Sequence, residues 1–436
     1  MRPHAETSTA RVLASACWES AVAERPLKLG MIGIGVGASF VLHGADRTDA
    51  IEIFAGADID PTSRERFAAR YPEARVYDTA DELVADPDVE AVWIATPNRF
   101  HCPHTVLAAE HGKHVVIEKP MALDLKEAAA MIEACRRNGV KLLAGHTRSF
   151  GAPIRLMRQI VHSGRLGALG AVNCFAYHDW VIHPRTAEEL DPDQGGGIVY
   201  RQVPHQIDSI RSIGSGKLRS VRGTYGQWMK ERPIPGYYAV FMEFENGVPA
   251  VAVQNGYGYF VTSELVPWGD GVTNYTLAER NELKRQMRSG SREEDAEKLE
   301  WRGRGPEGRQ GRRRPEERPR WKPGDMGIIV VSCERGDLRQ SPYGVYVYDD
   351  DGLKELRVDV SGGQSGELLE LFNAVRLGKP VYHSGEWGMA TLEVIMAINE
   401  SSKTHKDVLL THQVEMAAGY DEDYPVVVEE EVTVEA

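Results

Sequence analysis

Short apolar stretches alternate with amphipathic stretches through the first third of the chain. A strand buried inside a parallel sheet is apolar along its length, whereas a surface helix repeats its apolar positions every three to four residues. The apolar stretches predict strands at 29–34, 51–59, 90–95, 114–117 and 140–144, and the amphipathic stretches predict helices at 61–71, 80–85, 101–111 and 125–138. Strands that alternate with helices predict an α/β architecture with a doubly wound parallel sheet.

The pattern changes after residue 148. Helices are expected at 154–163, 198–213, 366–377 and 386–402, and strands at 171–180, 218–228, 237–244, 250–255 and 326–332. Glu245-Asn246-Gly247 separates two of these strands and is typical of a hairpin turn. This half therefore predicts an α+β domain with a largely antiparallel, open sheet.

Composition narrows the class of protein. The net charge of −13 argues against a nucleic-acid partner or an anionic membrane, and no apolar run is long enough to span a bilayer. The first 25 residues lack the features of a signal peptide. Five scattered cysteines without a C-x-x-C pair suit a reducing cytoplasm and predict neither a disulfide framework nor structural zinc.

A glycine-rich turn follows the first predicted strand. Gly33, Gly35 and Ala38 fit the pattern G-x-G-x-x-G/A, in which the first glycine makes a tight turn and the second lets the backbone approach a pyrophosphate. Alone, this pattern is as consistent with an ordinary strand–helix turn. Asp58, at the end of the next strand, stands where a dinucleotide fold places the carboxylate that holds the adenosine ribose. The complete order of these features predicts dinucleotide binding.

Asp58 also bears on which dinucleotide binds. Its alternative role, capping the next helix, is already served by Asp60-Pro61. A carboxylate repels a 2′-phosphate and so favours NAD, whereas Arg64 and Arg66 close behind keep NADP open.

These features divide the chain into regions. We expect an extension at 1–26, a Rossmann dinucleotide-binding domain at 27–148 and an α+β substrate and oligomerisation domain at 149–420. An insertion near 279–322 is crowded with Arg and Glu and is expected to be solvated and mobile. The acidic tail at 421–436 is expected to be an edge strand or disordered.

Residues just past two later strands are expected at the ligand site, because ligands of such sheets bind at the carboxyl ends of the strands. They are Thr96-Pro97-Asn98 and Glu118-Lys119-Pro120. Lys119 could donate to a substrate oxygen, although pairing with Glu118 is an equally good interpretation.

A second candidate cluster follows Gly195-Gly196-Gly197. On a continuous helix over 198–213, Arg201, His205 and Asp208 would share one face. A histidine near an arginine suits a proton acceptor beside an anion-binding group, whereas the alternative is a histidine bonded inside the core.

Two further histidine clusters are candidate metal or substrate sites. His101-Cys102-Pro103-His104 lacks further ligands nearby, so no metal site is expected there. His183 and Arg185 follow Tyr177-His178-Asp179-Trp180 and could line a substrate pocket or belong to a polar loop.

Together these motifs resemble the glucose–fructose oxidoreductase/inositol dehydrogenase/rhizopine-catabolism (Gfo/Idh/MocA) family over roughly 27–255. The resemblance rests on the glycine turn, Asp58, Thr96-Pro97-Asn98 with His101, Gly112-Lys113-His114, Glu118-Lys119-Pro120 and Gly195-Gly196-Gly197 through His205. It implies a cofactor, NAD or NADP, that contacts the glycine turn, Asp58 and the strand-end residues, including His101 and Glu118. It also implies homodimers or homotetramers packed through the open sheet.

The resemblance implies catalytic roles as well. Lys119 would contact the reacting hydroxyl and His205 would be the base. The segment from 183 to 214 is similar to a branch that oxidises a ring cis-diol such as phthalate 4,5-cis-dihydrodiol, whose ketone product tautomerises to a catechol. Arg148, Arg185, Arg201 and His183 are then candidates to bind an anionic substrate.

One position departs from the family. Sugar and polyol members usually carry Asp four residues before the histidine, where this chain has Arg201. Arginine cannot act as a base, so the polyol mechanism does not carry over unchanged. A dehydrogenase of a sugar acid, sugar or inositol, an enzyme that recycles NAD during hydrolysis or elimination, and a non-catalytic NAD(P)-sensing regulator remain alternatives.

Overall fold

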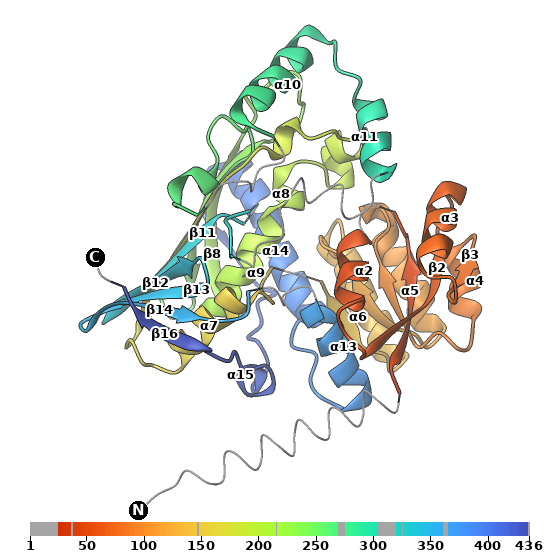
Figure 1. Ribbon diagram of the computed structural model, residues 1–436, viewed down its shortest axis with the longest axis horizontal. Coiled ribbons are helices and arrows are strands. Elements are labelled where there is room, and N and C mark those ends of the chain that lie inside the picture. The colour runs from red at the N-terminus through yellow and green to blue at the C-terminus, as the bar shows by residue number, and fades with distance from the viewer. Residues whose placement is uncertain are drawn as a thin grey trace, which may run out of the picture.

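Two sheets organise the protein (Figure 1). The computed structural model describes residues 25–35, 38–145, 148–214, 216–268, 275–303, 320–324, 326–360 and 365–434. The extension expected at 1–26 therefore lies almost wholly outside the described residues. Among the described residues, no helix is both long enough and apolar enough to cross a membrane.

The first sheet is the predicted parallel one. Its six strands run in the order β3-β2-β1-β4-β5-β6, and all pairs are parallel. The strands are β1 (Leu27–Ile32), β2 (Ile51–Ala57), β3 (Arg75–Tyr77), β4 (Ala91–Ile94), β5 (His114–Ile117) and β6 (Leu142–Ala144). The strand order reverses between β1 and β4, and this switch point is where open α/β sheets bind ligands.

Five helices of the described chain accompany this sheet, and the last four lie close to the predicted bounds. They are α2 (Ser39–Ala45), α3 (Pro61–Arg70), α4 (Ala80–Ala85), α5 (His101–Glu110) and α6 (Leu125–Arg137). Asp60 caps α3 as expected, since its carboxylate accepts the N–H groups of Thr62 and Ser63. Thr79 and Glu82 form a capping box that begins α4.

The second sheet has ten strands and is mostly antiparallel, as predicted. Its order is β15-β8-β9-β10-β7-β11-β12-β13-β14-β16, and only β7 and β10 pair in parallel. The strands are β7 (Leu169–Tyr177), β8 (Leu218–Gly226), β9 (Tyr237–Phe244), β10 (Pro249–Asn255), β11 (Ile328–Cys333), β12 (Gly336–Ser341), β13 (Gly344–Asp349), β14 (Gly352–Arg357), β15 (Val408–Leu409) and β16 (Glu430–Thr433).

Long helices cover one face of this sheet and lie between it and the first domain (Figure 1). They are α7 (Ala152–His162), α9 (Val203–Ile213) and α14 (Gly385–Thr404). Residues alternate along the strands between fully buried and half-exposed positions, so only one face is covered by the protein's own helices. Glu245-Asn246-Gly247 forms the expected hairpin turn, with Gly247 in the left-handed region at φ 84°.

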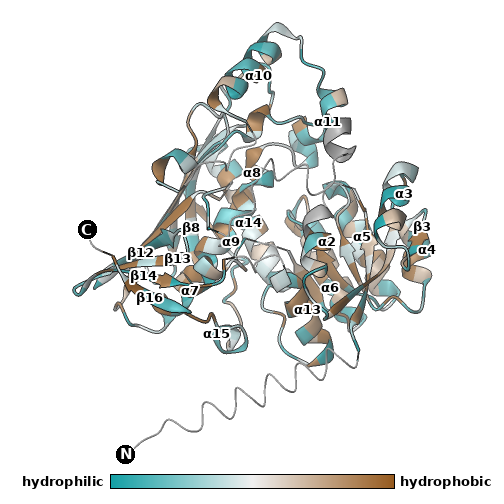
Figure 2. Ribbon diagram, viewed as in Figure 1, coloured by the Kyte–Doolittle hydropathy of each residue, from teal (hydrophilic) through white to brown (hydrophobic). Residues whose placement is uncertain are grey.

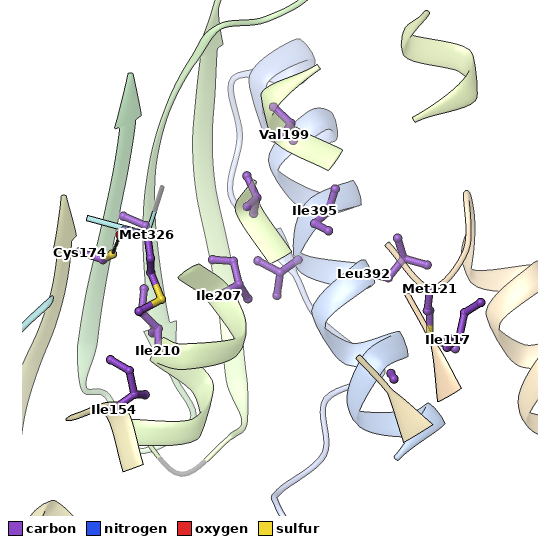
Figure 3. Close-up of a cluster of buried hydrophobic side chains, with 14 of the residues drawn as sticks. Ile117, Met121, Ile154, Cys174, Val199, Ile207, Ile210, Met326, Leu392 and Ile395 are labelled. Atoms are coloured by element: carbon purple, nitrogen blue, oxygen red, sulfur yellow. Dashed lines mark hydrogen bonds between the residues drawn. The ribbon is translucent and has the colours of Figure 1, made fainter. Parts of the chain in front are cut away.

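The two sheets share a continuous core. Figure 3 shows Ile117 and Met121 of the first domain packed near Leu392 and Ile395 of α14, with Ile207 of α9 beyond them. A further helix, α13 (Gly366–Arg376), returns to the first sheet and buries Leu368, Leu371 and Phe372 against its strands. The mixed brown and teal helices of Figure 2 show these amphipathic faces.

The charged insertion departs from expectation. Residues 279–322 were predicted to be solvated and mobile, yet α10 (Leu277–Ser289) and α11 (Glu294–Gly303) are formed. A capping box between Thr276 and Glu279 begins α10. Lys284 is buried, because its stem packs on the domain while its ammonium donates to the carbonyl of Gly258 at 2.9 Å. Residues 304–319, which hold most of the arginine-rich stretch, lie outside the described residues.

The C-terminal tail confirms one of its two expected forms. β16 pairs with β14 as the outermost strand of the second sheet. It follows the short helix α15 (Tyr420–Asp423).

Candidate active site

The glycine turn lies at the switch point of the first sheet. Gly33 has φ 85°, and a side chain there would lie 3.0 Å from the backbone of Ala95 after β4. Gly35 differs, because an added Cβ would meet no atom of the described residues within 4 Å. The turn is therefore closed toward the sheet at Gly33 and open at Gly35, while the buried Ala38 packs the following helix closely. This shape fits a bound dinucleotide phosphate.

Asp58 is fixed beside this turn. Its Oδ2 accepts the N–H of Ile34 at 3.0 Å and its Oδ1 accepts the N–H of Asp60 at 2.9 Å. Arg64 donates to the carbonyl of Asp58 at 2.7 Å and pairs with Asp78 at 3.0 Å. The carboxylate is thus fixed at the end of β2, beside the glycine turn that follows β1. Ile59, which the sequence analysis did not consider, is 88% exposed next to it and offers an apolar surface.

His101 joins the segments that follow β4 and β5. Its Nε2 lies 2.9 Å from the carbonyl oxygen of Thr96 and its Nδ1 lies 2.8 Å from that of Pro120. Burial lowers its pKa to about 4, although the two carbonyl oxygens favour the protonated ring. With 1% of its surface exposed, His101 positions the two segments and offers little surface of its own to a cofactor.

Asn98 connects the first domain to the glycine run of the second. Its side-chain amide is buried and donates to the carbonyl of Gln194 at 3.1 Å. A Cβ on Gly195 would lie 2.6 Å from the same amide nitrogen, which explains the glycine. Nearby, Thr96 Oγ1 lies 3.2 Å from Nδ1 of His104. Asn98 is therefore built into the interface between the domains, whereas the Thr96 side chain contacts a residue of its own domain.

Lys119 also contacts the second domain. The Lys119–Pro120 peptide is cis, Glu118 continues the strand ladder through its N–H, and Nζ of Lys119 donates to the carbonyl of Arg201 at 3.2 Å. Two candidates that are 82 positions apart in the sequence thus meet across the domain boundary.

The helix expected at 198–213 is broken. The structure has α8 (Ile198–Arg201) and α9, separated by Gln202 at φ −121° and ψ −36°. Pro204 lacks an N–H, and its ring prevents a helical backbone in the preceding turn. The prediction of one continuous helix was therefore wrong: Arg201 ends α8, whereas His205 and Asp208 lie on α9, where residues three positions apart share a face.

Asp208 turns out to be part of the core. It is fully buried, and its Oδ1 accepts the indole N–H of Trp387. His205 is buried too, but it stands directly after the break, where its own N–H donates to the carbonyl of Gln202 at 3.2 Å.

The four residues predicted to bind substrate differ in their exposure and in the contacts that their side chains make within the protein. Arg185 stacks on Trp180 at 3.8 Å and pairs with Glu189 at 3.3 Å, and His183 bonds Asp179 at 3.0 Å, so these two hold their own loop. Arg148 is exposed. Arg201 is partly buried, and its Nε makes no hydrogen bond to the described part of the chain.

Two domain models match the chain. Residues 27–146 match an oxidoreductase family with an NAD-binding Rossmann fold, and residues 154–258 match the GFO/IDH/MocA C-terminal domain. Together with the fold, these matches define an oxidoreductase with an NAD-binding Rossmann domain and a second, C-terminal domain. The chain belongs to the Gfo/Idh/MocA family.

Individual relatives agree with this assignment. A Comamonas testosteroni protein named 1-carboxy-3-chloro-3,4-dihydroxycyclohexa-1,5-diene dehydrogenase is 31% identical over 86% of this chain and 95% of its own length. A Bordetella bronchiseptica RB50 structure described as a dehydrogenase is 34% identical, with a TM-score of 0.79 over 88% of this chain and all of that one. A levoglucosan dehydrogenase complex with NADH shares the fold at 17% identity, with a TM-score of 0.66 over 88% of this chain and 99% of that one.

Proposed function

We propose that this NAD(P)-dependent oxidoreductase oxidises a ring cis-diol that carries a carboxylate, such as phthalate 4,5-cis-dihydrodiol, to the catechol. The observation that carries the proposal is the similarity, over nearly the whole of both chains, to a dehydrogenase named for a carboxylated cyclohexadiene diol. Arg201 supports it, because its guanidinium has a donor that no described group accepts from, and arginine binds carboxylates well.

Each side chain then has a defined task. Bound NAD supplies the hydride acceptor. His205 accepts the hydroxyl proton, Lys119 donates a hydrogen bond to the same oxygen, and Arg201 orients the ring through its carboxylate. The break at Gln202 suits this division of work, because it separates the anion-binding residue from the base.

Turnover on a substrate panel tests the proposal. Purified protein is mixed with NAD or NADP and with cis-dihydrodiols, sugar acids and inositols, and the absorbance of reduced nicotinamide is followed. Fast reduction with the phthalate dihydrodiol is expected. Reduction only with a sugar acid or inositol would replace the proposed substrate, and no reduction despite tight NAD binding would favour a regulator or an enzyme that recycles its NAD.

Asp58 is the residue that we expect to favour NAD over NADP. We expect Asp58→Asn to raise the ratio of kcat/KM with NADP to kcat/KM with NAD by about tenfold, because it removes the charge that repels a 2′-phosphate beside Arg64. Steady-state kinetics with both cofactors measure the ratio. Asp60→Asn, which changes the helix cap two residues away, is the matched control and should leave the ratio unchanged; an equal change in both variants would contradict the assignment of Asp58.

The open face of the second sheet supports a homo-oligomer. Phe175 is 40% exposed and pairs in register with Val253 on one side and Ile328 on the other, so apolar side chains run across neighbouring strands. We expect Phe175→Arg to lower the mass measured by light scattering to that of a monomer, because it places a charge in the buried centre of the interface. Phe100→Arg, at a phenylalanine that is 38% exposed on the first domain, should leave the mass unchanged.

A further inference from the structure

The charged insertion forms hydrogen bonds and ion pairs with the loop that leads to Gly195-Gly196-Gly197. Figure 1 shows α10 and α11 at the same end of the molecule as α8. Arg292 donates to the carbonyl of Ile182 at 2.6 Å, and Glu294 pairs with the buried Arg232 at 2.8 Å. Arg232 in turn donates to the carbonyl of Val181 at 2.9 Å. The start of α11 is therefore tied to the loop at 181–194 by charged groups that the domain has largely buried.

Glu189 is the central residue of this contact. Its Oε2 pairs with Nζ of Lys298 on α11 at 2.8 Å and accepts the N–H of Thr186 at 2.8 Å, while its Oε1 pairs with Arg185 at 3.3 Å. Lys298 also donates to the carbonyl of Pro184 at 3.3 Å. Burial by itself would raise the pKa of Glu189, but the charges of Arg185 and Lys298 hold it well below its ordinary value. The carboxylate is thus ionised and held from both sides.

The backbone of Glu189 continues the contact to the glycine run. Its carbonyl oxygen accepts the N–H of Gly197 at 3.3 Å, and a side chain on Gly196 would lie 2.7 Å from the same oxygen. Gly197 begins α8, which ends at Arg201, and the carbonyl of Arg201 accepts Lys119. A path of direct contacts therefore leads from Lys298 to the two candidate substrate-binding groups.

We propose that α11 is a clamp that sets substrate affinity: Lys298 and Glu189 hold the glycine run so that Arg201 stands ready for the substrate carboxylate. Lys298 is then a positioning residue, since it acts through Glu189 and touches no substrate. The effect on affinity rests on the proposed function, whereas the effect on the loop does not. The match to the C-terminal domain model covers residues 154–258, which include Glu189 and the glycine run but not α11.

Three variants of the full-length protein test the clamp. Lys298→Met removes the ammonium and keeps most of the stem, and Lys298→Arg restores the charge. Lys354→Met is the matched control, because Lys354 pairs with Glu431 at 3.8 Å on the outer strands of the second sheet. Amide hydrogen exchange of residues 186–197 reports on the loop, and steady-state kinetics with the dihydrodiol report on affinity.

We expect Lys298→Met to speed exchange in 186–197 by about tenfold, as a lost charge-assisted hydrogen bond implies. We also expect it to raise KM for the diol by about tenfold while kcat and the Kd for NAD stay within about twofold. Lys298→Arg should restore both values, and Lys354→Met should change neither. Unchanged exchange in Lys298→Met would overturn the clamp. Faster exchange with an unchanged KM would overturn its role in affinity. Faster exchange in a protein that turns over no diol would support the clamp and overturn the proposed function.

Discussion

A His205→Asn variant is expected to lose about 10²- to 10⁴-fold in kcat/KM for the diol, the usual contribution of a positioned general base. Asparagine cannot accept the hydroxyl proton, although it keeps a polar side chain of similar reach in the first turn of α9. The binding of NAD should be unchanged, because the candidate cofactor residues lie in the first domain. Stopped-flow absorbance measures turnover, and titration of protein fluorescence measures the Kd for NAD.

The position of His205 makes this variant informative. The residue follows the break between α8 and α9, and the end of α8 receives Lys119 through the carbonyl of Arg201. Lys119→Met should therefore also lose activity, and the double variant should lose much less than the sum of the two effects, because the residues act on one oxygen. His111→Asn, at an exposed histidine that ends α5, is the matched control.

More than a tenth of wild-type turnover in His205→Asn would show that another group is the base. If a cellular function of the protein survived in both His205→Asn and Lys119→Met, the non-catalytic NAD-sensing alternative would regain support. Loss of NAD binding in either variant would instead place that residue in the cofactor site.

A Glu370→Gln variant is expected to destabilise the folded protein by about 3–5 kcal/mol at acidic pH, the cost of removing one partner from a buried ion pair. Glu370 and His383 are both 0% exposed. The carboxylate accepts the N–H of His383 at 2.7 Å and the ring Nδ1–H at 2.8 Å, and the ring Nε2 lies 3.3 Å from Oγ of Ser149. The pair joins α13 to the segment before α14, in which the carbonyl of His383 accepts the N–H of Ala144 at the end of β6.

The pH dependence of this effect has a definite sign. Burial by itself would lower the pKa of His383, but the charge and hydrogen bond of Glu370 outweigh burial and raise it above 6.5. The charged pair therefore stabilises the folded state fully below pH 6.5, and this stabilisation is lost as the pH rises through the folded-state pKa. The loss of unfolding free energy caused by Glu370→Gln should accordingly become smaller at higher pH.

Urea unfolding at several pH values from 5.5 to 9, roughly the range in which a histidine titrates, measures both effects. Glu386→Gln is the matched control, because Glu386 is exposed at the start of α14, where it accepts a hydrogen bond from the hydroxyl of Ser384. A deficit in Glu370→Gln that stayed constant or grew with pH would contradict the assigned ion pair.

Some differences between expectation and structure had signals in the sequence. Pro204 inside a predicted helix indicates a break, and the structure has that break at Gln202. The strands β12, β13 and β14 were not predicted, yet Gly336, Gly344 and Gly352 recur every eight residues and each begins one strand. In both cases the proline or glycine signal was present in the sequence, but the prediction followed the apolar pattern of the flanking residues instead.

Other differences had no local signal. Arg185, Arg201 and Arg148 are chemically alike in the sequence, but the fold stacks Arg185 on Trp180, leaves Arg148 exposed and places Arg201 against Lys119. The charged side chains of the α10 and α11 region are likewise held by carbonyl groups and carboxylates that lie far away in the sequence. The charged composition alone does not reveal these partners, so it predicted a solvated segment.

The sequence by itself determined five of the six described strands of the first sheet, most of the helices beside them and the candidate cofactor residues, but not the short edge strand β3. Apolar runs, caps and the glycine at φ 85° act within a few residues of their own position, so local pattern is sufficient for them. Only the tertiary structure decided which candidates meet, because Lys119 contacts a carbonyl 82 positions away and Lys298 contacts a carboxylate 109 positions away. Contacts at such separations depend on how the two sheets pack around α9 and α14, and no local pattern encodes that packing.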